Sequence, residues 1–214
     1  MTTRHYNGTD RLILNADKAL RTLFGKPEVT ERENPSQSIN DTELSDNDRV
    51  HIAGLMRVNH TGEVCAQALY QGQALTAKLP NVREKMERAA QEENDHLDWC
   101  HQRLQELGSR TSYLNPLWYA GSLTMGAAAG LIGDKWSLGF VAETEHQVVK
   151  HLDEHMRQLP EQDQRSRAIL EQMKIDEEQH GTAAIKAGAA ELPTPVKKLM
   201  GMTSKIMTTI AYRI

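Results

Sequence analysis

Four long stretches of this sequence each carry a glutamate in the middle of an otherwise apolar stripe, and this pattern limits the fold more than any other feature. The apolar residues in each stretch recur at alternating steps of three and four, which is the period of an amphipathic α-helix. The glutamates that interrupt the stripes are Glu63, Glu93, Glu145 and Glu177. Such helices bury their stripes by packing against one another, so the sequence predicts an all-α protein with four long helices.

Capping and helix-breaking residues set the limits of the predicted helices. The long helices are expected at about 46–78, 81–107, 117–159 and 161–191, and the glycines of the third allow a break in it. Shorter helices are expected at 11–24 and 196–213. We therefore divide the chain into an N-terminal helix with a polar linker (1–45), a four-helix bundle (46–191) and a short C-terminal amphipathic helix that packs on the bundle or on a membrane (192–214).

The glutamates in the stripes need compensating positive charge, because burying a lone carboxylate costs on the order of several kcal/mol. Two of them begin a Glu-x-x-His step, which sets both side chains on one face of a helix. Ferritin-like di-iron and di-manganese bundles use this kind of ligand set. Two of their helices each contribute one glutamate, and the other two each contribute a Glu-x-x-His step. We predict a ferritin-like antiparallel four-helix bundle whose metal ligands are Glu63, Glu93, His96, Glu145, Glu177 and His180.

A third Glu-x-x-His step, Glu143 with His146, competes with Glu145 for the ligand position on its helix. Glu143 and Glu145 point about 200° apart around the helix axis, so only one of them can share the apolar stripe. Leu138 and Val141 are in phase with Glu145. Glu145 is therefore the predicted ligand.

Three further residues are candidates for orienting the ligands. Glu92 and Asp176 directly precede the two motif glutamates, and a metal-bound imidazole normally donates its second N–H to a carboxylate. The alternative is that both are solvated surface charges. His151, six residues after Glu145, is a weaker candidate for the same kind of role, and a surface position is the favoured alternative for it.

Charge and cysteine usage exclude several classes of protein. The formal net charge is −4 and is spread along the chain, which gives no basis for binding nucleic acid through phosphates. Two cysteines without a CxxC pair exclude a disulfide scaffold and a thiolate zinc site. The segment Met1–Asp10 shows no secretory signal, so we expect an intracellular protein.

Two segments suggest contact with a membrane. Ser112–Gly133 carries no formal charge and is long enough to cross a bilayer, but its many glycines and alanines insert weakly. A membrane span, an apolar patch docked on a membrane surface and an ordinary buried helix remain open, and the docked patch is favoured. The helix at 196–213 places Leu199, Met202, Ile206 and Ile210 on one face and lysines elsewhere.

The residues around the predicted ligands resemble the demethoxyubiquinone hydroxylases of ubiquinone biosynthesis, a family of ferritin-like di-iron monooxygenases, in their bacterial form. The stretch 57–63, Arg-Val-Asn-His-Thr-Gly-Glu, is similar to the family's first-ligand motif, and Glu-Asn-Asp-His-Leu at 93–97 is similar to its second. Glu145 stands where the third-helix ligand is expected, and Glu177 to His180 resembles the fourth motif. The resemblance extends from about Asp46 to the C-terminus and departs at His146, where some relatives carry a second glutamate.

The resemblance implies an enzyme that uses dioxygen and two iron ions per chain to hydroxylate a polyprenylated methyl-methoxy-benzoquinol, demethoxyubiquinol, at its unsubstituted ring carbon. Electrons would come from the quinol itself or from an NADH-linked reductase. It also implies a peripheral position on the cytoplasmic face of the cell membrane and other ubiquinone-biosynthesis proteins as candidate partners.

Other functions share a similar bundle and stay open from the sequence. They are a ferritin-like iron-oxidising or storage protein, a di-manganese catalase, a hydroxylase of modified tRNA, which the acidic balance disfavours, and a membrane-associated helical scaffold without catalysis. The scaffold leaves the glutamate of each stripe unexplained.

Overall fold

The computed structural model describes residues 7–30 and 32–214, and within these residues the side chains of 11, 12 and 80–85 are not described. The described chain is all-α and contains no strand. Its helices are α1 (Gly8–Phe24), α2 (Asp46–Thr76), α3 (Pro80–Glu106), α4 (Asn115–Ile132), α5 (Asp134–Gln158), α6 (Gln164–Lys186) and α7 (Thr194–Ala211). The predicted fold class is confirmed.

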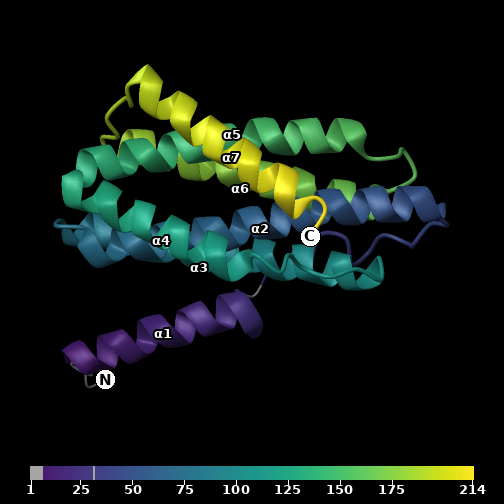
Figure 1. The fold of residues 1–214 in the computed structure, drawn as a ribbon, viewed down its shortest axis with the longest axis horizontal. Coiled ribbons are helices and arrows are strands. Elements are labelled where there is room, and N and C mark those ends of the chain that lie inside the picture. Colours follow the sequence, from purple (N-terminus) through teal and green to yellow (C-terminus); the bar gives the residue numbers. More distant parts are fainter. Residues whose placement is uncertain (1–6, 31) are drawn as a thin grey trace.

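Two helical hairpins form the bundle, and their helices run along the long axis of the molecule in Figure 1. The first hairpin pairs α2 with α3 and the second pairs α5 with α6, each through a short connection that makes its two helices antiparallel. Contacts between α3 and α6 and between α2 and α5 join the hairpins. This is the arrangement expected for four helices that each bury one stripe.

Local sequence signals explain where several helices begin and end. The Ser45 hydroxyl accepts a hydrogen bond from the backbone N–H of Asp48 at the start of α2, as a helix cap does. The predicted helix at 161–191 was too long at both ends. Asp163 caps α6 by accepting from the Ser166 N–H, and Gly188, with a φ of +98°, follows its last turn.

The predicted helix at 117–159 is in fact two helices, because the helix is interrupted at Gly133. Gly133 has a backbone φ of +138°, a value that residues with a Cβ atom rarely adopt. The break separates α4 from α5, so α4 leaves the bundle core and packs along the outside of α2 (Figure 1). Among the described residues, no helix is both long and apolar enough to span a membrane.

Small residues let α4 and α2 approach closely. A Cβ added at Gly126 would lie 2.2 Å from the Leu69 carbonyl oxygen, and one added at Gly72 would lie 2.3 Å from the Leu123 carbonyl oxygen. Both distances are shorter than any real contact between such atoms. Part of the glycine content of the uncharged segment therefore serves helix packing.

We expect Gly126→Ala to destabilise the protein by more than about 2 kcal/mol, because the added methyl would meet backbone that cannot move independently. Gly121→Ala is the matched control, since a Cβ there has nothing within 4 Å and alanine favours a helix by up to about 1 kcal/mol. Urea unfolding measures both. Equal stability of the two variants would show that α4 does not need this close approach.

Two of the three apolar clusters in the described chain enclose the polar site. One contains Met56, Cys100, Leu152 and Met173 among its buried members. The other contains Tyr70, Met86, Val141 and Ala184. On each of the four bundle helices the stripe glutamate lies between a member of one cluster and a member of the other, so the polar site is a layer enclosed by apolar side chains on both sides.

The C-terminal helix α7 crosses the bundle and is anchored at its end (Figure 1). A guanidinium nitrogen of Arg57 donates to the Tyr212 carbonyl oxygen at 2.8 Å, and the Tyr212 hydroxyl lies 2.7 Å from His51 Nδ1. The outer face of α7 leaves Leu199, Met202 and Ile206 more than half exposed. The helix thus packs on the bundle and still presents an apolar face to its surroundings.

Candidate metal centre

The six predicted ligands meet in the buried layer between the apolar clusters. Glu63 comes from α2, Glu93 and His96 from α3, Glu145 from α5, and Glu177 and His180 from α6. Glu93 and His96 are fully buried, the other three glutamates are at most 3% exposed, and the His180 side chain is 10% exposed. The pattern in the sequence therefore places all six in one solvent-poor layer.

Four of the six form the tightest group. Glu63, Glu93, His96 and Glu177 each offer a ligand atom, and these atoms all lie within 4.8 Å of one another. His96 Nδ1 is 3.0 Å from a Glu93 oxygen, 3.4 Å from a Glu177 oxygen and 3.7 Å from a Glu63 oxygen. Atoms that share one octahedral cation at about 2.1 Å lie about 3 Å apart, so this spacing suits a small divalent ion.

The carboxylates of Glu93 and Glu177 lie between the two imidazoles. The second oxygen of each faces His180, whose Nδ1 is 3.0 Å from Glu93 Oε1 and 3.4 Å from Glu177 Oε2. Each carboxylate thus turns one oxygen toward His96 and the other toward His180. Two carboxylates placed in this way could each offer one oxygen to a cation beside His96 and the other to a cation beside His180.

The fit to a metal is also visible in atoms that lack partners. Within the described part of the chain, Glu63 Oε2, Glu93 Oε1, Glu177 Oε2 and His180 Nδ1 are buried and make no hydrogen bond of acceptable geometry. Buried polar atoms are normally satisfied. Four of them that face one layer match the ligand atoms that divalent cations would satisfy.

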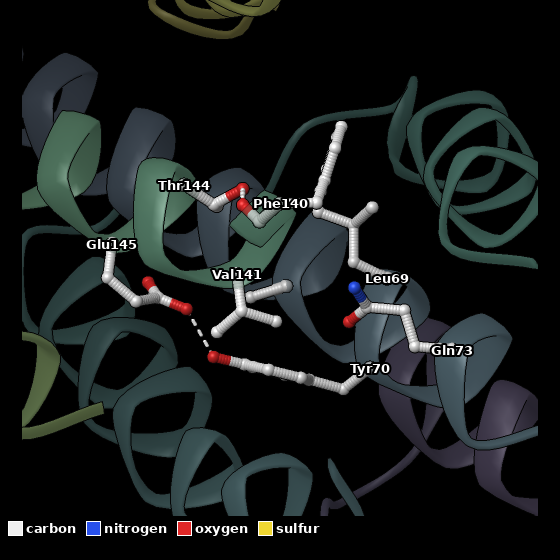
Figure 2. Close-up of a pocket in the computed structure, with 8 residues that line it drawn as sticks. Leu69, Tyr70, Gln73, Phe140, Val141, Thr144 and Glu145 are labelled. Carbon is white, nitrogen blue, oxygen red and sulfur yellow. Dashed lines mark hydrogen bonds between the residues drawn. The ribbon is translucent and has the colours of Figure 1, made fainter. Parts of the chain in front are cut away.

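Glu145 lies at the edge of this layer and confirms the phase argument for its helix. It is 2% exposed, and its carboxylate accepts a hydrogen bond from the Tyr70 hydroxyl (Figure 2). Glu143 points away from the layer, toward α7, where its carboxylate accepts from Gln147 at 2.8 Å and lies 3.5 Å from Lys197 Nζ.

The pKa values show how strongly the buried carboxylates and imidazoles act on one another. Burial, helped by the neighbouring carboxylates, raises the pKa of Glu63 and of Glu145 well above the ordinary value. Burial alone would lower the pKa of His180, but the carboxylates of Glu177 and Glu93 beside its ring outweigh that effect and raise it to about 12. The pKa of His96 is also raised, since Glu93 and other carboxylates face it and outweigh its burial. These shifts show that the carboxylates of the layer need positive charge beside them, which divalent cations would supply.

Glu92 and Asp176 each contact an imidazole, and they do so across the two helices. His96 Nε2, on α3, is 2.8 Å from Asp176 Oδ2 on α6. His180 Nε2, on α6, is 2.7 Å from Glu92 Oε2 on α3. An Nε2–H donated to a carboxylate leaves Nδ1 free to face a metal, which is how such outer carboxylates fix the tautomer. The two hairpins repeat this arrangement with an approximate twofold relation.

His151 lies on α5, but in the described part of the chain it does not contact the predicted ligands. Its ring contacts that of His155 at a tilt of 59°, with 3.9 Å between the ring centroids, and His155 Nδ1 lies 2.9 Å from Asn59 Oδ1. The contacts found for His151 in the described chain therefore tie it to His155 and not to the six predicted ligands.

Sequence reasoning missed two contacts of the site. Tyr70 lies two turns after Glu63 in the sequence, and the need of a buried hydroxyl for a partner was a signal that could have placed it at the site. Arg32 was assigned to a polar linker. It donates to Asp176 at 2.7 Å, a contact between residues so distant in the chain that no local pattern predicts it.

A narrow pocket reaches Glu145 from the surface between α2 and α5, and Figure 2 shows the side chains around it. Its lining is mostly apolar, with Leu69, Phe140 and Val141 among its members and Tyr70 beside Glu145 at one end. The pocket has a volume of about 10 Å³, so it is a small apolar gap beside Glu145 and not an open channel.

We expect Glu145→Gln to weaken binding of divalent metal by at least the 10- to 100-fold known for outer carboxylates, since it removes a carboxylate from the layer. Glu143→Gln, the matched control on the same helix, should leave metal content unchanged. Metal analysis after dialysis against Fe(II) measures both. Loss of metal in the Glu143 variant alone would overturn the assignment.

The fold and the buried cluster define an all-α, four-helix-bundle protein with a carboxylate and histidine site that could hold a metal. The family model described as "Ubiquinone biosynthesis protein COQ7" matches residues 50–211. The chain belongs to this family.

Relatives match the full length of the chain. Proteins named 3-demethoxyubiquinol 3-hydroxylase are 59% identical in Nitrosococcus oceani, over all of this chain and all of the relative, and 61% identical in Pseudomonas fluorescens, over 100% of this chain and 99% of the relative. The Azotobacter vinelandii protein of that name is 62% identical, over 99% of this chain and 98% of the relative.

Proposed function

We propose that this protein is an O₂-dependent di-iron monooxygenase that hydroxylates a polyprenylated methyl-methoxy-benzoquinol, 3-demethoxyubiquinol, in ubiquinone biosynthesis. The observation that carries the proposal is the pair of crossed Glu-x-x-His motifs, in which Glu93 and Glu177 lie between two imidazoles. The full-length relatives named for this reaction support it. Iron storage, catalase, tRNA modification and a non-catalytic scaffold are not favoured by these relatives.

Six residues would hold the two ions: Glu63, Glu93, His96, Glu145, Glu177 and His180. Four carboxylates contribute −4 and two divalent ions +4, so with neutral imidazoles the loaded layer is formally neutral inside an apolar bundle. Iron bound there would supply the activation of dioxygen, and carboxylate and imidazole ligands suit Fe(II). Glu92 and Asp176 would orient the two imidazoles by accepting their Nε2–H protons.

The overall reaction balances as a monooxygenation. One oxygen atom of dioxygen enters the C–H bond at the unsubstituted ring carbon and becomes a hydroxyl group. The other leaves as water, which takes up two protons and two electrons. The electrons come from the quinol itself or from an NADH-linked donor, and both sources are compatible with the buried site.

The small pocket between α2 and α5 marks a point where a substrate ring could reach the site if its lining opened. Its volume of about 10 Å³ holds no more than a water molecule, so Leu69, Phe140 and Val141 would have to move apart to admit a ring beside Glu145 and Tyr70. The Tyr70 hydroxyl holds Glu145, and burial raises the pKa of Tyr70 well above its ordinary value. Tyr70 therefore stays a neutral hydrogen-bond donor at the point where the ring would meet the metal layer.

We expect Fe(II)-loaded protein, given demethoxyubiquinol, a reductant and ¹⁸O₂, to form a product that carries one ¹⁸O atom. His180→Gln should reduce turnover by about 100-fold or more, because it removes a ligand, whereas Glu143→Gln should retain it. Mass spectrometry of the quinone measures both. Rapid iron oxidation without a labelled product would instead support an iron-oxidising protein.

The exposed apolar faces of α4 and α7 support a peripheral position on the cytoplasmic face of the cell membrane, where a polyprenylated substrate resides. Leu117 and Leu131 on α4 and Leu199 and Met202 on α7 are more than 60% exposed. Such faces, with lysines beside them, bind at a bilayer surface. Another protein of ubiquinone biosynthesis is the alternative occupant of these faces.

Flotation with vesicles that contain anionic lipid tests this location. We expect the wild-type protein to float with the vesicles and Met202→Glu to reduce the bound fraction several-fold, since it places a charge on the apolar face. Gln91→Glu adds the same charge at an exposed position on α3 and should change little. A wild-type protein that stays with the soluble fraction would favour a protein partner.

A further inference from the structure

Thr30 and Arg32 of the N-terminal linker bind a fully buried carboxylate on α3. Asp95 on α3 is 0% exposed. Its two oxygens accept from the Thr30 backbone N–H and the Thr30 hydroxyl, both at 2.7 Å. One of them also accepts from Arg32 Nε at 2.5 Å. The linker is thus held to the bundle by charged and neutral hydrogen bonds at one buried point.

Arg32 extends from this point to the outer carboxylate of His96. Its second donor group bonds Asp176 Oδ2 at 2.7 Å, and the same oxygen lies 2.8 Å from His96 Nε2. A further guanidinium nitrogen donates to the Glu92 carbonyl oxygen at 3.2 Å. The planar guanidinium therefore fixes Asp176, and Asp176 fixes the imidazole.

The charge of Arg32 would oppose a nearby cation if nothing balanced it. Asp95 supplies one negative charge to the same guanidinium. The ion pair of Arg32 and Asp95 therefore holds Asp176 in place without adding net charge to the site. The negative charge of Asp176 remains available to His96.

The other half of the site has a much looser support. Glu92, which contacts His180, is held by Arg88 on its own helix, with 2.7 Å between Arg88 Nε and Glu92 Oε1. The side chains of Arg88 and Glu92 are 69% and 26% exposed. Arg32 is 33% exposed and Asp176 10%. Exposed ion pairs contribute little, because water screens them and both side chains move.

We propose that Arg32 is a positioning residue that makes the metal position at His96 the tighter of the two, so that divalent ions bind there first and at His180 second. The inference rests on the proposed function, because it needs a site for two ions. Thr30 and Arg32 lie in the N-terminal linker, so this support reaches the site from a segment that precedes the bundle helices.

Stepwise anaerobic titration with Co(II), followed by visible absorbance and calorimetry, tests the proposal. We expect two distinguishable steps in the wild-type protein. Arg32→Met should weaken the first step about 10- to 100-fold, which is the usual effect of losing an outer partner, and should leave the second nearly unchanged. Arg32→Lys should recover part of the lost affinity. Lysine keeps the positive charge but cannot donate to Asp95 and Asp176 from a planar group as arginine does.

Three controls separate positioning from a general loss of structure. Arg88→Met removes the matching residue of the other half and should leave the first step unchanged. His180→Gln should retain the tight step, and His96→Gln should retain only the weak one. A merely structural role of Arg32 would weaken both steps equally.

The outcomes also separate this inference from the proposed function. Any of three results would overturn the inference and leave the two-metal site in place. They are two equal steps in the wild-type protein, equal weakening of both steps by Arg32→Met, and a tight step that survives His96→Gln. Binding of fewer than two ions by the wild-type protein would overturn the proposed function itself.

Discussion

The burial of four carboxylates in one layer is the constraint on which this structure depends. Removing a carboxylate from water is unfavourable unless another charge or hydrogen bonds compensate it. Glu93 and Glu177 obtain that compensation from His96 and His180, which lie within 3.0–3.4 Å of their oxygens. Each bundle helix must therefore turn its glutamate toward the same layer, and the register of the two hairpins follows from this requirement. The apolar clusters on either side keep water out and strengthen every interaction inside.

The fold and the six buried residues could be predicted because both depend on helical period. Glu145 and Glu143 show this most clearly, since the phase of the neighbouring apolar residues separates the buried glutamate from the one that faces α7. The sequence also suggested Glu92 and Asp176 as partners of the imidazoles, because each directly precedes a motif glutamate. The crossing of these contacts between α3 and α6 was not predicted, because it depends on how the two hairpins face each other.

Two other features lay outside what local patterns can predict. The break at Gly133 makes α4 a separate helix, although the predicted helix only allowed a break among its glycines. Its glycines are used where α4 contacts α2, so their number does not by itself indicate a membrane role. Arg32 reaches Asp176 from a linker with no periodic pattern. Such contacts depend on the path of the whole chain.

The most direct test of the account is a crystal structure of the protein soaked anaerobically with Fe(II), with anomalous diffraction measured at the iron edge. The account predicts two peaks about 3.5–4 Å apart, one beside Nδ1 of His96 and one beside Nδ1 of His180, with Glu93 and Glu177 between them. A single peak, or iron bound away from these residues, would contradict the central claim that the buried carboxylates and imidazoles form a two-metal site.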